Sequence, residues 1–260
     1  MNKHEFRVGI EVGGTFTDLV ASDGYQIKTA KVPSTPSKPD EGAMNAIRAA
    51  ELDISQIKEL VHGSTVATNA VLERKGGRVC LFVTKGTRDI LLLQRHDRRS
   101  IYDLHYKKPE PVVARHDTYE IKERISPDGA IVLDIDEDHA REQIKTALRD
   151  GRFDSAAICF LHSYTNSRHE RLLKELIQQE FPSLPITCSC DVTREFREYE
   201  RASTTTLAAY VQPVIAGYIK RFSASLAKQG FKGRFSIMQS NGGRMPAEAM
   251  AKNAISALFS

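Results

Sequence analysis

The sequence lacks the features that mark a membrane protein or a nucleic-acid-binding protein. Its 260 residues contain no apolar run that approaches the roughly 18 residues needed for a membrane-spanning helix. The 37 lysines and arginines are spread along the chain without a block of like charges, and aromatic residues do not alternate with them. The net charge of +4 therefore does not indicate a nucleic-acid surface. We expect partners other than nucleic acid or a membrane.

Cysteine is scarce, and the first residues contain no signal-peptide core. The segment MNKHEFRVGI enters a strand-like run directly, which favours a cytoplasmic protein. The four cysteines, Cys80, Cys159, Cys188 and Cys190, lie in or beside apolar segments and are expected to be reduced thiols. The pair Cys188 and Cys190 is a possible metal ligand, but it has no second cluster, so the alternation of a buried strand is the favoured interpretation.

The sequence does contain an alternation of strand-like and helix-like segments. Strands are predicted at residues 6–12, 18–23, 25–33, 59–62, 78–86, 153–164, 184–190 and 231–239, with two more around the turn 126–129, and helices at 40–52, 66–75, 137–151 and 166–181. A longer helical pattern, residues 196–229, is interrupted at Pro213. The charged segment 87–118 is interpreted as a loop that could cover a site. Strands alternating with helices predict an α/β protein with a mixed sheet and flanking helices.

The stretch RVGIEVGGTFTDLVAS contains a glycine turn between two strands, with hydroxyl side chains beside it. A tight turn between antiparallel strands directs consecutive backbone N–H groups to one side, which suits an anion. Gly13 and Gly14 remove the Cβ atoms that would keep a phosphate at a distance. Thr15 and Thr17 can each add a hydroxyl donor. The turn is therefore predicted to hold phosphate oxygens; the alternative is an ordinary hairpin turn.

Two carboxylates flank the same turn. Glu11 and Asp18 can hold a hydrated Mg²⁺, which prefers carboxylates combined with substrate phosphates. The stretch contains neither a Walker A loop nor the dinucleotide G-x-G-x-x-G fingerprint, and it does not open a helix. A phosphate-binding hairpin at the start of a three-stranded meander is typical of the actin, Hsp70 and sugar-kinase ATPases. The carboxylates and the turn together predict a Mg-ATP site.

Two further segments at strand ends are candidate ligand contacts. The candidates are His62, Gly63, Ser64 and Thr65, and Asn241 and Gly242. The first segment lies between a strand and a helix, so its N–H groups and hydroxyls could hold a carbonyl or a phosphate, or could simply cap the helix. The second follows a strand, where ligands bind in α/β sheets, although a plain turn also explains it.

Six sequence blocks, in one order, resemble the N-terminal part of the hydantoinase A/5-oxoprolinase family. They are GIEVGGTFTD, HGSTVATNAVLERKGGRVCLFVTKGTRDIL, IYDL, FLHSYTNSRHE, EFREYERASTTTLAAYVQPV and MQSNGG. The family also includes the ATP-binding subunits of acetone and acetophenone carboxylases. The resemblance implies the N-terminal portion of an actin-like ATPase (ribonuclease H-like) fold, with ATP and Mg²⁺ as cofactors. It further implies that the oxygen of a small cyclic amide, or of a ketone enolate, is activated by phosphorylation.

The resemblance also assigns roles to individual residues. Five of them match the first phosphate loop of the family: Gly13, Gly14, Thr15, Thr17 and Asp18. Glu11 departs from the aspartate that is usual there, and its extra methylene group puts the magnesium geometry in question. Glu11 and Asp18 are the candidate metal ligands and catalytic carboxylates.

The resemblance implies a division into domains and a need for a partner. Residues 1–190 correspond to the N-terminal domain of the family and residues 191–260 to the start of a second ATPase domain. The family's second Asp-x-Gly-Gly-Thr hairpin does not occur in the 260 residues, and the sequence ends on the apolar run NAISALFS. We therefore expect either a second hydantoinase-type subunit or a missing C-terminal segment.

Three functions remain open at this point. The resemblance favours an ATP-dependent hydrolase of cyclic amides of the hydantoin or 5-oxoproline type. The alternatives are the ATP-using subunit of a ketone carboxylase and a truncated, non-catalytic binding or regulatory subunit. A glucokinase-like sugar kinase is disfavoured, because its Cys-rich zinc motif and Glu-x-Gly-His block are absent from the sequence.

Phosphoryl transfer needs positioning and charge neutralisation on both sides of the nucleotide, and one hairpin supplies only one side. We predict that the isolated chain binds Mg-ATP weakly and hydrolyses it negligibly. Isothermal titration with Mg-ATP, combined with a phosphate-release assay, measures both quantities. Tight binding accompanied by steady turnover would contradict this prediction.

Overall fold

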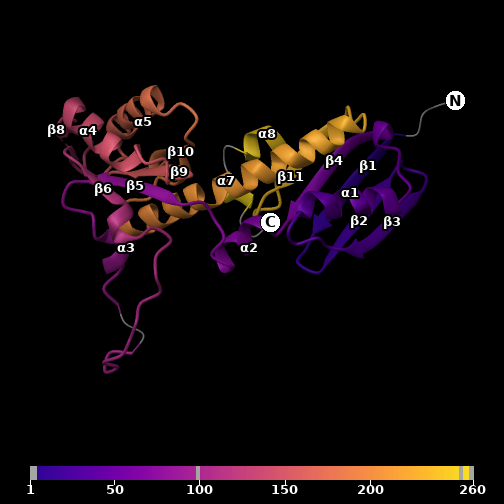
Figure 1. Cartoon of the computed structure of the whole chain (residues 1–260), viewed down its shortest axis with the longest axis horizontal. Helices are drawn as coiled ribbons and strands as arrows, with labels where there is room; N and C mark the ends of the chain where they lie inside the picture. Colours follow the sequence, from indigo (N-terminus) through magenta and orange to yellow (C-terminus); the bar gives the residue numbers. More distant parts are fainter. Residues whose placement is uncertain (1–4, 98–99, 252–253, 258–260) are drawn as a thin grey trace. The chain divides into compact units, whose positions relative to one another are not determined.

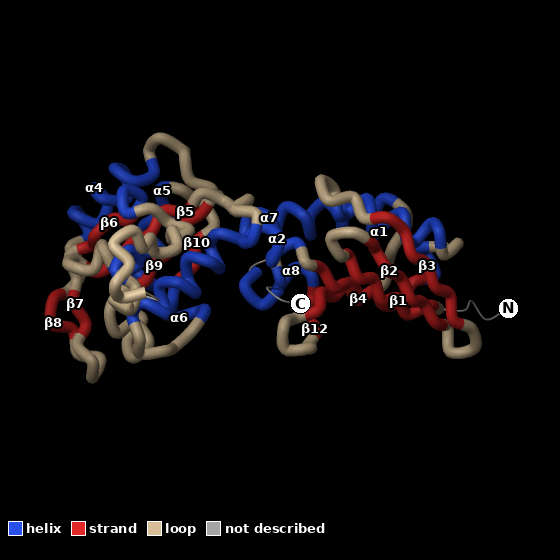
Figure 2. The backbone as a smooth tube through the Cα atoms, turned by 90° about the horizontal axis from the view of Figure 1, so that it is seen from below, coloured by secondary structure: helices blue, strands red, loops and turns tan. Residues whose placement is uncertain are grey.

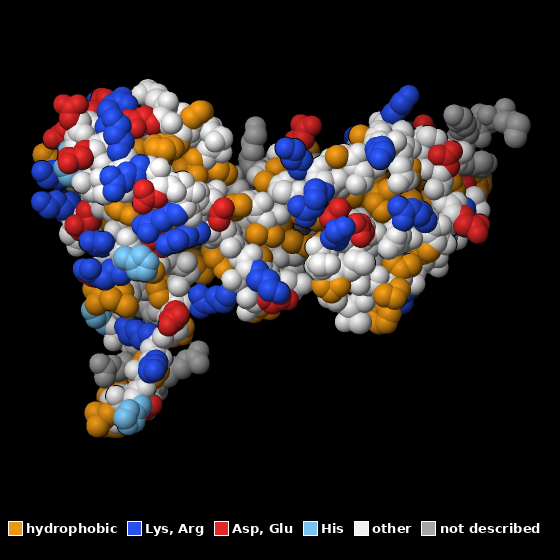
Figure 3. Space-filling view, in the orientation of Figure 1, with side chains coloured by type: hydrophobic (Ala, Val, Ile, Leu, Met, Phe, Trp, Pro, Cys, Tyr) orange, Lys and Arg blue, Asp and Glu red, His pale blue; other side chains and the backbone are white. Residues whose placement is uncertain are grey.

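The structure is a computed structural model that describes residues 5–97, 100–251 and 254–257, and it contains two compact units. Unit 1 consists of Met1–Lys75 and Val214–Ser260, and unit 2 of Gly76–Pro213 (Figure 1). These units are defined by packing, whereas the predicted domains 1–190 and 191–260 follow sequence blocks. That division by sequence stays a prediction. Within each unit, positive and negative side chains are interspersed on the face shown in Figure 3.

Unit 1 is built on a six-stranded mixed sheet with the strand order β12-β11-β4-β1-β2-β3 (Figure 2). The strands are β1 (Phe6–Val12), β2 (Phe16–Ser22), β3 (Ile27–Pro33), β4 (Ile57–Ser64), β11 (Arg234–Met238) and β12 (Arg244–Pro246). The first three form an antiparallel meander, while β4 is parallel to β1 and β11 is parallel to β4. The carboxyl ends of β1, β4 and β11 therefore lie at one edge of the sheet.

Helices cover one face of this sheet, and the first two strands alternate strictly between buried and exposed residues. In β1 every second residue is buried, from Phe6 to Val12, and β2 alternates in the same way. The inward residues pack against α1 (Pro39–Ala49) and the second half of α7 (Glu198–Lys228). The core comprises Phe6, Val8, Ile10, Val12, Leu19, Ala21, Ala43, Met44, Ala46, Ile47, Phe222 and Leu226, among others. The opposite face of β1 and β2 is left with exposed side chains.

Shorter elements complete unit 1 around the sheet. They are η1 (Ile54–Gln56), α2 (Val66–Leu72), α8 (Ala247–Met250) and η3 (Ala254–Ala257). Of these, α2 follows β4 directly, at the edge where the parallel strands end. None of the helices in the described ranges is both long and apolar enough to cross a membrane.

Unit 2 is built on a parallel four-stranded sheet with the order β10-β9-β5-β6. Its strands are β5 (Val79–Thr84), β6 (Thr118–Ile121), β9 (Ser155–Cys159) and β10 (Ile186–Cys188), and a separate pair is formed by β7 (Arg124–Ile125) and β8 (Ile131–Leu133). The helices are α3 (Ile90–Leu93), η2 (Arg115–Asp117), α4 (Glu137–Leu148), α5 (Arg168–Glu180), α6 (Ser189–Val192) and the first half of α7. Every residue of β5 and β9 is buried, as expected for central parallel strands. The predicted α/β class, with a mixed sheet and flanking helices, is confirmed.

The expected interruption at Pro213 is wrong, because α7 runs through it without a break. Proline has no N–H group to donate to the carbonyl four residues earlier, which is that of Ala209. The buried Ser155 hydroxyl donates to the Ala209 oxygen instead, at 2.7 Å, and the Gly77 N–H donates to the Tyr210 oxygen at 2.8 Å. Partners from elsewhere in unit 2 thus satisfy the carbonyls around the proline, and the helix continues.

The expected alternation at Cys188 and Cys190 is also wrong, because β10 ends at Cys188 and α6 begins at Ser189. The buried Glu170 carboxylate holds this change of direction: Ser189 Oγ donates to it at 2.6 Å and the Cys190 N–H at 3.0 Å. The four cysteines are all buried and unpaired by disulfides, and burial raises the pKa of Cys159 to about 11. Among the described residues, no group of three or more His, Cys, Asp or Glu side chains could hold a metal ion.

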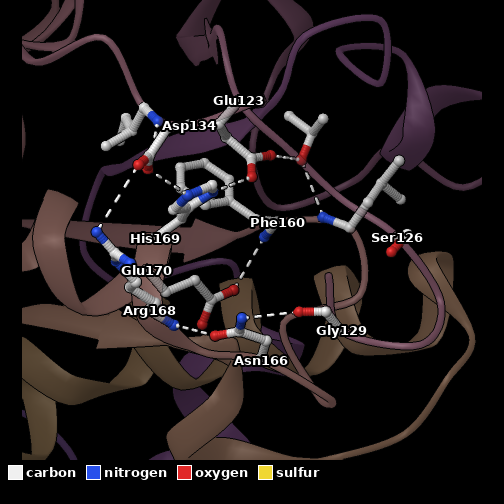
Figure 4. Close-up of polar contacts among 12 residues, drawn as sticks. Glu123, Ser126, Gly129, Asp134, Phe160, Asn166, Arg168, His169 and Glu170 are labelled. Carbon is white, nitrogen blue, oxygen red and sulfur yellow. Dashed lines mark hydrogen bonds and ion pairs between the residues drawn. The ribbon is translucent and has the colours of Figure 1, made fainter. Parts of the chain in front are cut away.

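A buried hydrogen-bonded network ties the elements of unit 2 together (Figure 4). His169, on α5, contacts the Glu123 carboxylate through Nδ1 at 2.7 Å and the Asp134 carboxylate through Nε2 at 2.9 Å. The Thr84 hydroxyl donates to Glu123, and the Leu161 N–H donates to Thr84 Oγ1 at 2.9 Å. Burial alone would lower the pKa of His169, but the hydrogen bonds and charges of the two carboxylates outweigh it and raise the pKa.

The raised pKa of His169 predicts a specific pH dependence of stability. The folded state holds the proton more tightly than the unfolded state, so the stabilisation is complete below about pH 6.5 and is lost as the pH rises through the folded-state pKa. The free energy of unfolding should fall there by up to about 1.4 kcal/mol per pH unit. Urea unfolding between pH 5.5 and 9 measures this slope, and His169→Gln should remove it. An identical pH profile in the variant would contradict the assignment.

Candidate functional site

The turn between β1 and β2 is a tight bend that leaves one glycine facing open space. The Gly13 N–H donates to the Phe16 oxygen at 3.1 Å, which closes the turn around Gly14 and Thr15. The Ser34 N–H donates to the Thr15 oxygen at 2.9 Å and anchors the tip to the segment that follows β3. A Cβ added at Gly14 would meet no atom within 4 Å. The tip therefore offers backbone groups and free space, as an anion-binding turn requires.

The two predicted carboxylates lie opposite each other on neighbouring strands. Glu11 of β1 pairs in register with Asp18 of β2, and on its other side Glu11 pairs with Gly63 of β4. A Cβ built on Gly63 would overlap the Glu11 carboxylate, so the glycine provides the space that the longer side chain occupies. Partial burial, and then the charge of Asp18, raise the pKa of Glu11. Asp18 itself forms an ion pair of 2.9 Å with Lys31.

This carboxylate pair fits a hydrated magnesium ion in charge and in ligand type. Two like charges on adjacent strands disfavour each other, and a bound cation removes that cost. Mg²⁺ keeps several of its waters and needs only one or two protein carboxylates. Glu11 and Asp18 would hold it, and the Lys31 ammonium group would have to share Asp18 with the ion.

The alternation of β2 separates Thr17 from Asp18. Asp18 lies on the exposed face of the sheet, whereas Thr17 is fully buried on the face covered by α1. The Thr17 hydroxyl lies 2.9 Å from Ser34 Oγ, in the segment that joins β3 to α1. The two hydroxyls expected at the turn therefore differ: Thr15 is exposed at the tip, and Thr17 is bonded inside.

A cavity of about 500 Å³ lies beside the turn in unit 1. Its lining comes from the end of β1 and the turn, the segment before α1, and α2 with the residues that flank it. The lining residues are Val12, Gly13, Gly14, Ser34, Thr35, Pro36, Ser37, Pro39, Thr65, Val66, Asn69, Ala70, Glu73, Lys75 and Val214. Of the predicted site residues, Gly13, Gly14 and Thr65 line this cavity.

The predicted segment 62–65 is divided between several roles. His62 is fully buried among aromatic rings; its Nδ1 lies 3.2 Å from the Ile10 oxygen, and Tyr218 bonds its Nε2. Burial lowers the pKa of His62 to about 4, so the ring is neutral and joins β4 to β1 and α7. Ser64 Oγ accepts the Val66 N–H at 3.2 Å, a local bond one residue before Thr65, the N-cap residue of α2, whose side chain makes no capping hydrogen bond. The structure thus places His62 away from the cavity.

The predicted residues after β11 form a self-contained turn. The Asn241 side chain accepts the Gly243 N–H at 2.8 Å, and Gly242 has the positive φ of 81° that favours glycine. Neither Asn241 nor Gly242 lines the cavity, so the plain-turn alternative describes this geometry.

Some lining residues carry no motif that singled them out in the sequence. They are Ser34, Thr35 and Ser37, together with Asn69 and Lys75, which lie within the block HGSTVATNAVLERKGGRVCLFVTKGTRDIL but were assigned no role. The available signal is the concentration of hydroxyl residues in Ser34–Ser37, directly after the third strand.

Together, the sheet and the turn define a class: α/β proteins in which a glycine hairpin and paired carboxylates meet at the edge where parallel strands end. Two family models match the chain. The hydantoinase/oxoprolinase N-terminal region matches residues 7–181, and the hydantoinase/oxoprolinase model matches residues 201–260. The chain belongs to the hydantoinase/oxoprolinase family.

Several relatives are similar over nearly all of the chain. An uncharacterized protein of Methanocaldococcus jannaschii is 39% identical over 243 residues, which cover 92% of this chain and 36% of the relative. The caprolactamase alpha subunit of Pseudomonas jessenii is 31% identical over 271 residues, covering 100% of this chain and 39% of the subunit. The solved structure of the ATP-dependent caprolactamase from that organism matches with a TM-score of 0.86 and 31% identity, over 97% of this chain and 38% of that chain.

A nucleotide-free acetone carboxylase, from a study of ATP-dependent acetone carboxylation, matches with a TM-score of 0.82 and 25% identity, over 97% of this chain and 39% of that chain. The chain spans less than two fifths of the length of each of these relatives. The caprolactamase relative is named as a subunit of its enzyme.

The contact between Gly63 and Glu11 generates a matched pair of variants. Gly63→Ala should destabilise unit 1 by about 1–3 kcal/mol, because the new Cβ overlaps the Glu11 carboxylate. Gly9→Ala is the control, since its Cβ would lie at an ordinary 3.9 Å from the Val20 oxygen. Adding Glu11→Ala to Gly63→Ala should restore most of the loss. Urea unfolding measures all three; equal stability of the two single variants would refute the contact.

Proposed function

We propose that this chain belongs to an ATP-dependent hydrolase of cyclic amides, in which it supplies the first phosphate loop. The observation that carries the proposal is the open glycine turn beside the cross-strand pair of Glu11 and Asp18. The family supports this proposal, because a solved structure of a family relative is that of an ATP-dependent caprolactamase. The name caprolactamase indicates a lactam substrate, and a lactam is a cyclic amide. Hydantoins and 5-oxoproline contain the same functional group.

In this proposal each side of the turn has a distinct task. Gly13, Gly14 and Thr15 hold phosphate oxygens of ATP, and Glu11 and Asp18 hold Mg²⁺ or its waters. ATP supplies the phosphoryl group that makes the amide carbonyl electrophilic enough for water to open the ring. The chain's own contribution is to position the phosphates and to neutralise their charge, on which phosphoryl transfer mainly depends. Thr17 acts indirectly, through its hydrogen bond to Ser34.

The remaining parts of the proposal concern the whole enzyme. We infer that a second hydantoinase-type subunit, or a further segment of the same protein, completes the site. The support is that each of these relatives is more than twice as long as this chain and that one is named as a subunit. Residues 1–190 and 191–260 correspond in this view to two family domains, and the enzyme acts in the cytoplasm.

A ketone carboxylase subunit is the second candidate, and the match to acetone carboxylase favours it. The phosphoryl chemistry would be the same, directed at an enolate oxygen. Assays of the completed enzyme with hydantoin, 5-oxoproline and caprolactam, and separately with acetone and bicarbonate, distinguish the two. A chain that binds Mg-ATP in an assembly with none of these activities would indicate a regulatory subunit.

The open space at Gly14 provides the sharpest test of nucleotide binding. Gly14→Ala should leave the stability within about 0.5 kcal/mol of the parent, because its Cβ meets no protein atom. It should weaken Mg-ATP binding at least about tenfold, or about 1.4 kcal/mol, by holding a phosphate away from the turn. NMR titration with millimolar Mg-ATP detects weak binding by this chain. Gly9→Ala is the control, and equal affinities of the two variants would remove the turn from the nucleotide site.

A further inference from the structure

The cavity in unit 1 and the carboxylate pair lie on different sides of the same hairpin. Val12 lines the cavity and is buried on the face that carries α1, whereas Glu11, the residue before it, lies on the other face. The cavity is also lined by residues 34–37 before α1, by Pro39 at the start of α1, and by Val214 of α7. The cavity therefore opens on the helix-covered side of the sheet, and Glu11 and Asp18 do not line it.

The lining has the chemistry of a site for a neutral molecule. Its apolar members are Val12, Pro36, Pro39, Val66, Ala70 and Val214. Its hydrogen-bonding side chains are hydroxyls and one amide, and its two charged side chains, Glu73 and Lys75, neutralise each other at 2.7 Å. A triphosphate needs a surplus of cations, which this lining does not supply. An apolar wall with a few polar groups, in a volume of about 500 Å³, is typical of sites for small molecules.

The hydroxyl group of Ser34, a lining residue, is assigned as a hydrogen-bond acceptor toward the neighbouring Thr17. Thr17 is fully buried, and within the described part of the chain its hydroxyl has one hydrogen-bond partner, Ser34 Oγ at 2.9 Å. If Ser34 donated, the Thr17 proton would be buried without an acceptor, which is unfavourable. Thr17 therefore donates and Ser34 accepts. The proton of Ser34, which lines the cavity, is left for an acceptor on a ligand.

A complementary acceptor is provided by Asn69 on α2. Its Nδ2 donates to Thr65 Oγ1 at 3.2 Å, and its Oδ1 is an acceptor on a residue that lines the cavity. A cyclic secondary amide carries one acceptor, its carbonyl oxygen, and one donor, its ring N–H. The lining thus offers a donor at Ser34 and an acceptor at Asn69 for the two polar groups of such a ring.

We propose that this cavity binds the neutral cyclic amide, with Ser34 donating a hydrogen bond to the amide oxygen and Thr17 acting as the positioning residue for Ser34. The inference rests on the proposed function, since it places the amide on one side of the turn and the nucleotide with its metal on the other. Gly13 and Gly14 border the cavity and follow β1, so the turn is where the two ligands meet.

The test uses 2-pyrrolidinone, a small neutral lactam, titrated into this chain and followed by backbone amide NMR shifts. The expected shifts are at Ser34, Ser37, Val66 and Asn69, and not at Glu11 or Asp18. Ser34→Ala and Thr17→Val should each weaken binding about five- to tenfold. Thr17→Ser should retain it, and the double variant Thr17→Val/Ser34→Ala should be no weaker than Ser34→Ala alone. Thr29→Val, an exposed position on β3, is the control and should have no effect.

Three results would overturn the inference. The first is that the lactam causes no saturable NMR shifts up to about 100 mM, and the second is that Ser34→Ala binds the lactam as tightly as the parent chain does. The third is that tripolyphosphate, and not the lactam, shifts the signals of the cavity residues. A parallel titration with Mg-ATP separates this failure from failure of the proposed function. If Mg-ATP shifts the turn and the lactam leaves the cavity unchanged, the inference alone is wrong. If Mg-ATP does not change the NMR shifts of the turn residues, the proposed function is wrong, and the inference that rests on it is wrong with it.

Discussion

The cross-strand pairing of Glu11 with Asp18 is the constraint on which the rest of the site depends. A strand alternates its side chains with a period of two, so once this pair occupies one face, Val12 and Thr17 must occupy the other. The carboxylates are thereby kept with the glycine turn on an exposed face, while hydroxyl and apolar groups are collected beneath the helices. One register fixes both the charged and the neutral side of the hairpin.

Partial burial, and then the neighbouring charge of Asp18, disfavour the ionised Glu11 carboxylate, as its raised pKa indicates. Gly63 is part of this arrangement, because only a residue without a Cβ leaves room for the Glu11 side chain. In unit 2 the neighbouring carboxylates have a bridging partner within the unit. There the carboxylates of Glu123 and Asp134 are bridged by His169, so the network stabilises the fold without an outside partner. In unit 1, Lys31 pairs with Asp18, and Glu11 beside it is the carboxylate that a bound cation would neutralise, so this pair is the feature that points to a ligand.

Much of the fold could be predicted from local patterns, since the meander, the parallel strands and the glycine turn each have a recognisable pattern of consecutive residues. The features that sequence reasoning missed depend on partners distant in the chain. Pro213 stays within a helix because Ser155 reaches Ala209, and His62 is buried because Tyr218 and Ile10 hold it. The candidate site was found through Gly13 and Gly14, but the direction of the Thr17 hydroxyl required the position of Ser34.

The most direct measurement of the central claim is the pKa of the Glu11 carboxyl group, followed by carbon NMR with and without Mg-ATP. If the pair binds the metal of a nucleotide held at the turn, the raised pKa should fall when Mg-ATP is added. The fall should be much smaller in Asp18→Asn. A Glu11 pKa that does not change under saturating Mg-ATP would contradict the account, because the carboxylate would then have no cation to neutralise it.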